Sequence, residues 1–226
     1  IYDNGWKGPD RGHGHAIYTQ NAGGVKTISD CIMTGGYGQT VHAYGSKRAY
    51  VDNYLITGNI AYSAARFLVG GGRPSKGIRV AGNMLHGVSM QIGYNAPHNE
   101  DCDVRDNIIV DGSLDIVRYK KAVRSGNLVL ARGAKQPADA APRIIVRANK
   151  YDANRANVAI YSWAGKDPSI DPGQLKDILK PGDSYRLMDP RDFYGKPVLS
   201  GTYDGKAIVI PMKNRMFAAM VLLKGI

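Results

Sequence analysis

A segment that repeats along the chain restricts the fold of this 226-residue protein more than any other feature. Each copy has a β-branched or apolar residue, then a small or polar pair, then Asp or Asn, then an apolar run. The six copies span residues 26–36, 49–59, 78–88, 103–112, 123–131 and 145–153. The aligned residues are Asp30, Asn53, Asn83, Asn107, Asn127 and Asn149. Their spacing of about 20 to 30 residues is typical of stacked structural repeats.

A second strand pattern recurs between these copies. It spans residues 15–20, 40–45, 66–71, 89–94 and 114–119. Two or three short strands per repeat, with turn residues between them and no 3.6-residue period, predict a parallel β-helix. Asn suits the corners, because it tolerates the left-handed conformation and its amide can bond the next coil. A β-sandwich over residues 1–151 is the alternative, although sandwich strands do not normally repeat an Asn through six units.

The repeat fades after about Asn154, which divides the chain into a β-helix over residues 1–154 and a second module over residues 155–226. In the second part, Tyr203–Asp204–Gly205 before an alternating strand is a hairpin signal. The strongly apolar strand 217–223 must be buried between neighbours. Residues 1–5 read like the end of a strand and its turn, so we expect upstream β-helix coils to be missing from this chain.

The chain is basic, with a net charge of +11. Nucleic acid, an anionic membrane or an acidic polysaccharide would each be attracted to it, and a generally basic soluble surface is the plain alternative. The Lys and Arg residues are scattered, which argues against nucleic acid as a partner. No apolar run of about 18 residues predicts a membrane span. Cys31 and Cys102 match neither a disulfide framework nor a zinc site.

The outward side chains of the second strand pattern form the candidate ligand face. Neighbouring coils stack about 4.8 Å apart, so equivalent side chains can contact one ligand. Tyr rings stack on sugars and Arg pairs with carboxylates, which favours an acidic polysaccharide or oligosaccharide. Polar and aromatic ladders also occur on β-helices merely to cover the sheet. The residues expected on or near this face are His15, Tyr18, Gln20, His42, Tyr44, Arg66, Gln91, Tyr94 and Arg118.

A lyase that removes a proton beside a uronate carboxylate needs a base and a group that neutralises the carboxylate. His42 or Tyr18 is the candidate base, and Tyr44 is the candidate proton donor. Arg66 or Gln91 is the candidate neutralising group. The expected substrate-binding residues are His15, Gln20, Gln91, Tyr94 and Arg118.

Two further readings concern hydrolysis and metal binding. A glycoside hydrolase needs two facing carboxylates, and the predicted face offers only Asp115. His13 and His15 form an H-x-H pair that could place both rings on one side of a strand as metal ligands. The alternative places His13 in a loop whose path the glycines set, with His15 facing the groove. We favour that alternative and expect no metal and no cofactor.

The sequence YDNGW at 2–6, the run GHGHAIYTQN at 12–21, the echo VHAYGS at 41–46 and the DN and GN corners resemble one known group. They are similar to bacterial right-handed parallel β-helix proteins of the pectate-lyase-like superfamily, over roughly residues 1–151. The resemblance implies a right-handed coil, a carbohydrate-related role and, often, a secreted or envelope location. The calcium-binding aspartates and catalytic Arg setting of pectate lyases form no motif here, so that activity is not carried over. Residues 179–205 are loosely similar to β-modules appended to carbohydrate-active enzymes.

We therefore expect an all-β protein, with a right-handed parallel β-helix (solenoid) followed by a small antiparallel β-sandwich-like module. The expected function is action on an acidic polysaccharide, as a lyase working by β-elimination, in a secreted or cell-envelope protein. A non-catalytic polysaccharide-binding or surface scaffold protein is the first alternative. A glycoside hydrolase or an epimerase is the further one.

Overall fold

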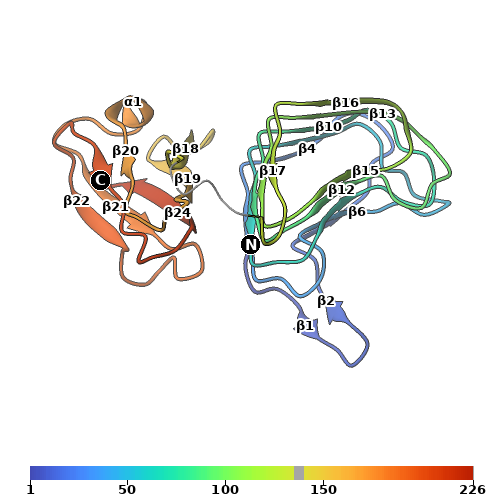
Figure 1. The fold of residues 1–226 in the computed structure, drawn as a ribbon, viewed down its shortest axis with the longest axis horizontal. Coiled ribbons are helices and arrows are strands. Elements are labelled where there is room, and N and C mark those ends of the chain that lie inside the picture. Colours follow the sequence, from blue (N-terminus) through green and yellow to red (C-terminus); the bar gives the residue numbers. More distant parts are fainter. Residues whose placement is uncertain (135–139, 226) are drawn as a thin grey trace. The chain divides into compact units, whose positions relative to one another are not determined.

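The structure is a computed structural model that describes residues 1–134 and 140–225. The chain forms two compact units, Ile1–Ala134 and Lys135–Ile226. Figure 1 shows flat, stacked coils in the first unit and a sheet of antiparallel strands in the second. Within the described ranges, no helix is long and apolar enough to cross a membrane. The predicted all-β architecture is confirmed, because the helix α1 (Pro172–Leu175) is only one turn long.

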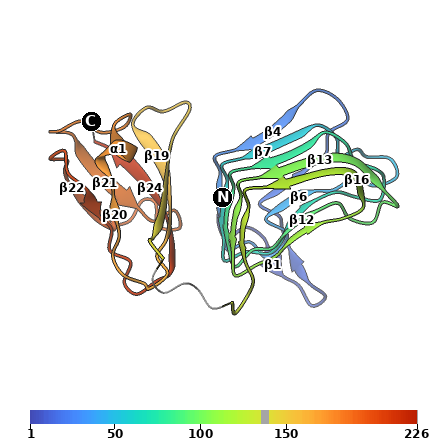
Figure 2. The same cartoon turned by 45° about the horizontal axis from the view of Figure 1, so that its top comes forward.

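Three parallel sheets form the walls of the first unit (Figure 2). The first contains β4 (Lys26–Ser29), β7 (Tyr54–Thr57), β10 (Ile78–Ala81), β13 (Asn99–Arg105) and β16 (Tyr119–Ser125). The second contains β5 (Ile32–Thr34), β8 (Ile60–Tyr62), β11 (Met84–His86), β14 (Ile108–Val110) and β17 (Leu128–Leu130). The third contains β3 (Ile17–Thr19), β6 (Val41–Ala43), β9 (Phe67–Val69), β12 (Met90–Ile92) and β15 (Leu114–Ile116). Neighbours in each sheet come from successive coils, which confirms the predicted parallel β-helix.

The core of the β-helix is built from alternate residues of each short strand, because side chains of a strand point to opposite faces in turn. Val41, Phe67 and Met90 stack inward from the third sheet, and all three are fully buried. Ile56 and Val80 do the same from the first sheet. The side chains between these residues in sequence point outward, which makes the third sheet's outer face available to carry chemistry.

An asparagine ladder closes one corner of the β-helix. Asn59 donates through Nδ2 to Oδ1 of Asn83, Asn83 to Asn107, and Asn107 to Asn127, each at 2.9 Å. Each acceptor oxygen also takes the backbone N–H of the preceding Asn at 3.0 Å. Stacked amides therefore satisfy a buried corner, and the prediction is confirmed for Asn83, Asn107 and Asn127.

The first member of the ladder is Asn59, and the predicted alignment through Asn53 is wrong. The residue just before each ladder position adopts the left-handed conformation, as Gly58 and Asp106 do. Asp30 adopts it as well, so it corresponds to Gly58 rather than to a ladder residue. Asp and Asn suit both the left-handed bend and the amide bond, so the sequence pattern alone does not distinguish these two adjacent positions.

The sixth predicted repeat is not a coil of the β-helix. Its strand β18 (Arg143–Ala148) pairs antiparallel with β19 (Arg155–Tyr161). Asn149 accepts the backbone N–H groups of Tyr151 and Asp152 within the turn between them. The units divide at Ala134, earlier than the predicted boundary at residue 154. An apolar strand followed by Asn fits a hairpin as well as a coil, and here the local turn decides.

The second unit is an antiparallel sheet in the order β18, β19, β24, β21, β22. Its remaining strands are β21 (Ser184–Met188), β22 (Leu199–Thr202) and β24 (Phe217–Lys224), and β20 (Ser169–Ile170) pairs separately with β23 (Ile208–Val209). The apolar strand β24 lies between β19 and β21, as its composition predicted. Leu222, Leu187 and Ile160 pack in the core of this unit with Leu175 of α1.

Candidate functional site

A small hairpin at the start of the β-helix forms one side of the candidate site (Figure 1). Its strands are β1 (Trp6–Lys7) and β2 (Gly12–His13), and Trp6 lies opposite His13. The two rings stack with centroids 5.0 Å apart, and Asp10 Oδ1 lies 2.9 Å from His13 Nε2. The Trp6 face of the hairpin is open to solvent, since 63% of the residue surface is exposed.

Two glycines allow the hairpin to lie directly on the first coil. A Cβ on Gly12 would come within 1.9 Å of the Tyr37 carbonyl oxygen. A Cβ on Gly38 would come within 2.1 Å of the Gly14 carbonyl oxygen and 2.7 Å of Nδ1 of His15. Gly12 and Gly38 therefore have a steric role in placing the hairpin and its histidines against the first coil.

A cavity of about 500 Å³ lies at the first coil, lined by the hairpin and by the outer face of β3 and β6. Its lining residues are Arg11, Gly12, His13, Gly14, His15, Tyr18, Tyr37, Gly38, Gln39, His42, Tyr44 and Ala65. Aromatic rings, imidazoles and one guanidinium are present, and none of these lining residues is Asp or Glu. This volume lies in the usual range for small-ligand pockets, about 300 to 1,000 Å³.

His15 and His42 form a hydrogen-bonded pair in the cavity wall. The backbone N–H of Gln39 donates to His15 Nδ1 at 2.8 Å. His15 Nε2 lies 3.1 Å from His42 Nδ1, and the ring centroids are 4.5 Å apart. The neighbouring coil thus fixes the orientation of His15, and His15 fixes that of His42.

Burial favours the neutral form of both rings. Burial, together with smaller contributions from nearby His15 and Arg66, lowers the pKa of His42 from 6.5 to about 4. Burial also lowers the pKa of His15; the contact with Gln39 partly opposes this effect of burial, and the charge of Arg11 adds a smaller lowering. A histidine with a pKa near 4 is neutral at pH 7, so His42 meets a ligand uncharged.

A row of rings continues from the cavity along the third sheet. Tyr18 lies opposite His42 in the β3–β6 register, as predicted, and the ring centroids are 5.2 Å apart. His42 contacts Tyr44 at 4.9 Å, and Tyr44 contacts Tyr94 at 5.9 Å. The structure therefore groups His15, Tyr18, His42 and Tyr44 in the cavity and places Tyr94 just beyond it.

Arg66 and Gln91 lie next to this row and do not line the cavity. Arg66 Nη1 donates to Gln91 Oε1 at 2.5 Å, and its guanidinium lies 5.8 Å from the Tyr94 ring centroid. Leu68 occupies the outward position between His42 and Gln91, and it is 2% exposed. Leu68 thus lies between His42 and Gln91 in the sheet, while Arg66 is near enough for its charge to act on His42.

Gln20 and Arg118 also lie outside the cavity lining. Gln20 donates through Nε2 to the Tyr44 carbonyl oxygen at 3.1 Å, which ties two coils together. Arg118 has a left-handed backbone and donates to the Ala96 carbonyl oxygen at 3.0 Å. Each side chain is held by the backbone of a neighbouring coil, so both residues have a structural role in linking coils.

Sequence reasoning missed Arg11, Tyr37 and Gln39 as lining residues. Arg11 lies in the turn of the hairpin, and its signal was the sequence GPDRG between two short extended segments. Tyr37 and Gln39 lie at a corner before β6, where no alternation shows which way a side chain points. His13 and His15 have different partners, so the H-x-H pair does not converge on one point.

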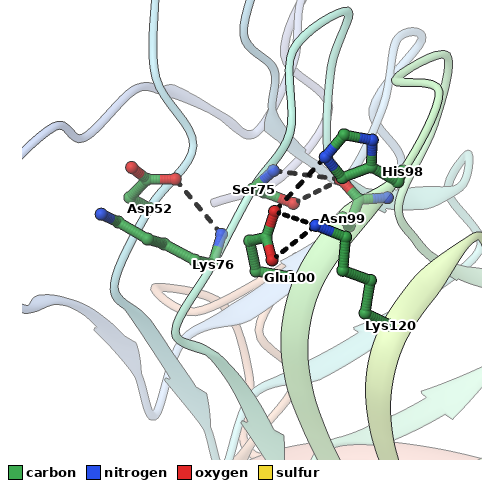
Figure 3. A network of polar contacts seen from close by, with 7 residues as sticks. All are labelled: Asp52, Ser75, Lys76, His98, Asn99, Glu100 and Lys120. Atoms are coloured by element: carbon green, nitrogen blue, oxygen red, sulfur yellow. Dashed lines mark hydrogen bonds and ion pairs between the residues drawn. The ribbon is translucent and has the colours of Figure 1, made fainter.

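A second polar network lies elsewhere on the β-helix (Figure 3). Glu100 accepts from Lys120 at 2.9 Å and lies 3.3 Å from His98. Asn99 Oδ1 accepts both the backbone N–H and the hydroxyl of Ser75. The Lys120–Glu100 and Ser75–Asn99 contacts join successive coils, and none of these residues lines the cavity.

No family model, no curated protein and no solved structure matches this chain. The coordinates bear out the parallel β-helix that the resemblance implied, while membership of the pectate-lyase-like superfamily stays a prediction.

Proposed function

We propose that this protein acts on an acidic polysaccharide and cleaves it by β-elimination in the first-coil cavity. The observation that carries the proposal is the cavity lining, which combines phenols, imidazoles and Arg11 with no carboxylate among its members. Aromatic rings suit sugar faces, and the guanidinium of Arg11 favours an acidic sugar. The net charge of +11 acts in the same direction over longer distances. A polymer outside the cell is consistent with a secreted or envelope location, which we include in the proposal.

The elimination requires three groups around one sugar. A base takes the proton from the carbon beside the carboxylate, a carbon–carbon double bond forms, and the bond to the leaving sugar oxygen breaks. In this proposal Tyr18 accepts the proton as its phenolate, and the hydroxyl of Tyr44 protonates the leaving oxygen. Arg11 and His42 are the lining groups that offset charge on the carboxylate.

Hydrolysis is less consistent with this wall, because glycoside hydrolases use two carboxylates about 5 to 9.5 Å apart across the bond. Asp10 is engaged by His13 at 2.9 Å and Arg11 at 3.6 Å. Asp115 lies opposite Gln91, beyond Leu68, and accepts a hydrogen bond from Ser113. Neither of these two carboxylates lines the cavity.

A non-catalytic sugar-binding protein is the second candidate. The row from Tyr18 to Tyr94 and the exposed face of Trp6 favour it, because aromatic rings bind sugars without needing a base. This candidate predicts binding of acidic sugars with no bond cleavage.

The full chain should be incubated with polygalacturonate, alginate and a glucuronate polymer while the ultraviolet absorbance of unsaturated ends is followed. We expect absorbance to rise with at least one polymer. Tyr18→Phe should abolish the rise while binding remains, because the ring stays and the proton acceptor is lost. Tyr151→Phe, at an exposed tyrosine of the second unit, is the matched control and should leave the rate unchanged. Binding without any absorbance change would sink the lyase and favour the second candidate.

A further inference from the structure

The hydrogen bonds of His15 determine which of its nitrogens carries the proton. The backbone N–H of Gln39 can only donate, so His15 Nδ1, 2.8 Å away, accepts and carries no proton. The neutral His15 ring therefore has its proton on Nε2. That proton faces Nδ1 of His42 at 3.1 Å, so His42 Nδ1 accepts it.

The hydrogen bond from His15 also determines which nitrogen of His42 carries the proton. With Nδ1 accepting, a neutral His42 carries its proton on Nε2. His42 lines the cavity, and in the described part of the chain its Nε2 has no hydrogen-bond partner. The opposite tautomer would put a proton on Nδ1 and require His15 to accept on Nε2. His15 would then have to lose the Gln39 hydrogen bond or exist without any ring proton.

We propose that His15 is a positioning residue that holds His42 as a neutral donor, and that the His42 Nε2–H binds a carboxylate oxygen of the ligand. The inference rests on the proposed function, because an acidic sugar supplies that oxygen. Because Nε2 of His42 then carries the proton, this atom cannot accept the proton of the substrate. Tyr18 is then the base of the elimination.

The neighbouring groups fit this arrangement. A hydrogen bond to a charged acceptor is about twice as strong as one between neutral groups, so an uncharged imidazole can bind a carboxylate effectively. The ring of Tyr18 lies 5.2 Å from the His42 ring. A carboxylate bound at His42 therefore brings the adjacent carbon, which carries the acidic proton, next to the Tyr18 side of the wall.

Nuclear magnetic resonance can read the tautomers directly in the full chain labelled with ¹⁵N. The protein has 5 histidines, and His15→Gln and His42→Gln would identify the two sets of ring signals. At neutral pH we expect both rings to show a bare Nδ1 and a protonated Nε2. A protonated Nδ1 on His42 in the wild-type chain would overturn the proposal, whatever the variants do.

Ligand addition tests the donor role. Short oligomers of galacturonate, mannuronate and glucuronate are the acidic probes, and a neutral galactose oligomer of the same length is the matched probe. We expect at least one acidic oligomer, and not the neutral one, to shift the His42 Nε2–H signal. His15→Ala should lower the affinity for that oligomer about tenfold and leave His42 as a mixture of tautomers. His98→Ala, at a histidine outside the cavity, should change neither.

The outcomes separate this inference from the proposed lyase. A shifted His42 signal with no unsaturated product would sink the elimination and support the donor. Turnover with an unshifted His42 signal would overturn the donor and leave the elimination standing. An unshifted signal with no turnover would contradict both.

Discussion

Backbone groups of neighbouring coils hold side chains in the cavity and next to it. The N–H of Gln39 orients His15, and the carbonyl of Tyr44 holds the amide of Gln20. In a parallel β-helix each coil presents its backbone to the next at a fixed spacing, so side chains regularly come within reach of the neighbouring backbone. The consequence is a preorganised wall. The Gln39 backbone orients His15, and His15 in turn orients His42.

At this scale we expect stability to depend on His42 protonation. Its pKa is about 4 in the folded chain and near 6.5 in the unfolded one, so the unfolded state binds more protons between these values. The contribution of His42 to the free energy of unfolding should therefore be complete above about pH 6.5 and decline as the pH falls towards about 4. Urea unfolding across this window should show a shallower decline for His42→Gln than for the wild type. Equal declines would contradict the lowered pKa.

Single residues on strands could be predicted from sequence, and residues at corners could not. Alternation placed Tyr18 and His42 correctly outward, because the side-chain period of a strand is two. Tyr37 lies at a corner, where this period stops. The pairing of His15 with His42 was also invisible, since it depends on how the Gln39 backbone approaches from the next coil.

The strands and corners of the β-helix depend on the asparagine ladder. Asn83 is fully buried, and its side chain connects Asn59 to Asn107. The ladder spacing is 24 residues from Asn59 to Asn83 and 24 from Asn83 to Asn107, so those coils are equal in length. The last step, from Asn107 to Asn127, spans only 20 residues and keeps the same 2.9 Å bond, so the loops absorb the difference in coil length.

Asn83→Ala should destabilise the first unit by about 3 kcal/mol, because it leaves several buried amide groups without partners at about 1 to 3 kcal/mol each. Asn95→Ala, at an exposed loop residue of the same unit, is the matched control and should change stability by less than about 0.5 kcal/mol. Urea unfolding followed by circular dichroism measures both. A loss no larger for Asn83→Ala than for Asn95→Ala would argue against a stabilising ladder.

The close contact between the hairpin and the first coil at Gly38 gives a second prediction at this scale. In Gly38→Ala the new methyl group would collide with the Gly14 carbonyl oxygen and crowd His15, so the hairpin must move. We expect this variant to bind acidic oligosaccharides more weakly, as calorimetric titration can show. Gly23→Ala adds the same methyl group where no atom lies within 4 Å and should bind like the wild type. Wild-type affinity in both variants would contradict the steric role of Gly38.

The elements themselves were predictable where the pattern was long and periodic. Five coils with apolar alternation gave the parallel β-helix, and the apolar composition of β24 gave its central place in the second unit. β18 was assigned wrongly because six residues of strand carry no information about their partner. Only the turn at Asn149 and the antiparallel register with β19 distinguish a hairpin from another coil.

The molecule as a whole joins a β-helix to an antiparallel module, each with its own apolar core. All cavity residues belong to the first unit. The excess of 30 basic over 19 acidic residues is distributed over the whole sequence. The cavity therefore supplies short-range recognition, while the overall charge supplies long-range attraction.

This division predicts how salt acts on binding. The screening length falls from about 10 Å at 0.1 M salt to about 3 Å at 1 M, which weakens long-range attraction more than contacts in the cavity. Association of acidic oligosaccharides should slow with added salt while dissociation changes little. Surface plasmon resonance at the two salt concentrations measures both rates. A salt-independent association rate would remove the role assigned to net charge.

Recognition of an acidic sugar by the first-coil cavity is the central claim, and calorimetric titration of the wild type and His42→Ala tests it most directly. The ligands are the galacturonate, mannuronate and glucuronate oligomers and the neutral galactose oligomer. We predict that the wild type binds at least one acidic oligomer and not the neutral one, and that His42→Ala weakens this binding at least about tenfold. Equal affinity for acidic and neutral oligomers, or unchanged affinity in His42→Ala, would contradict the claim.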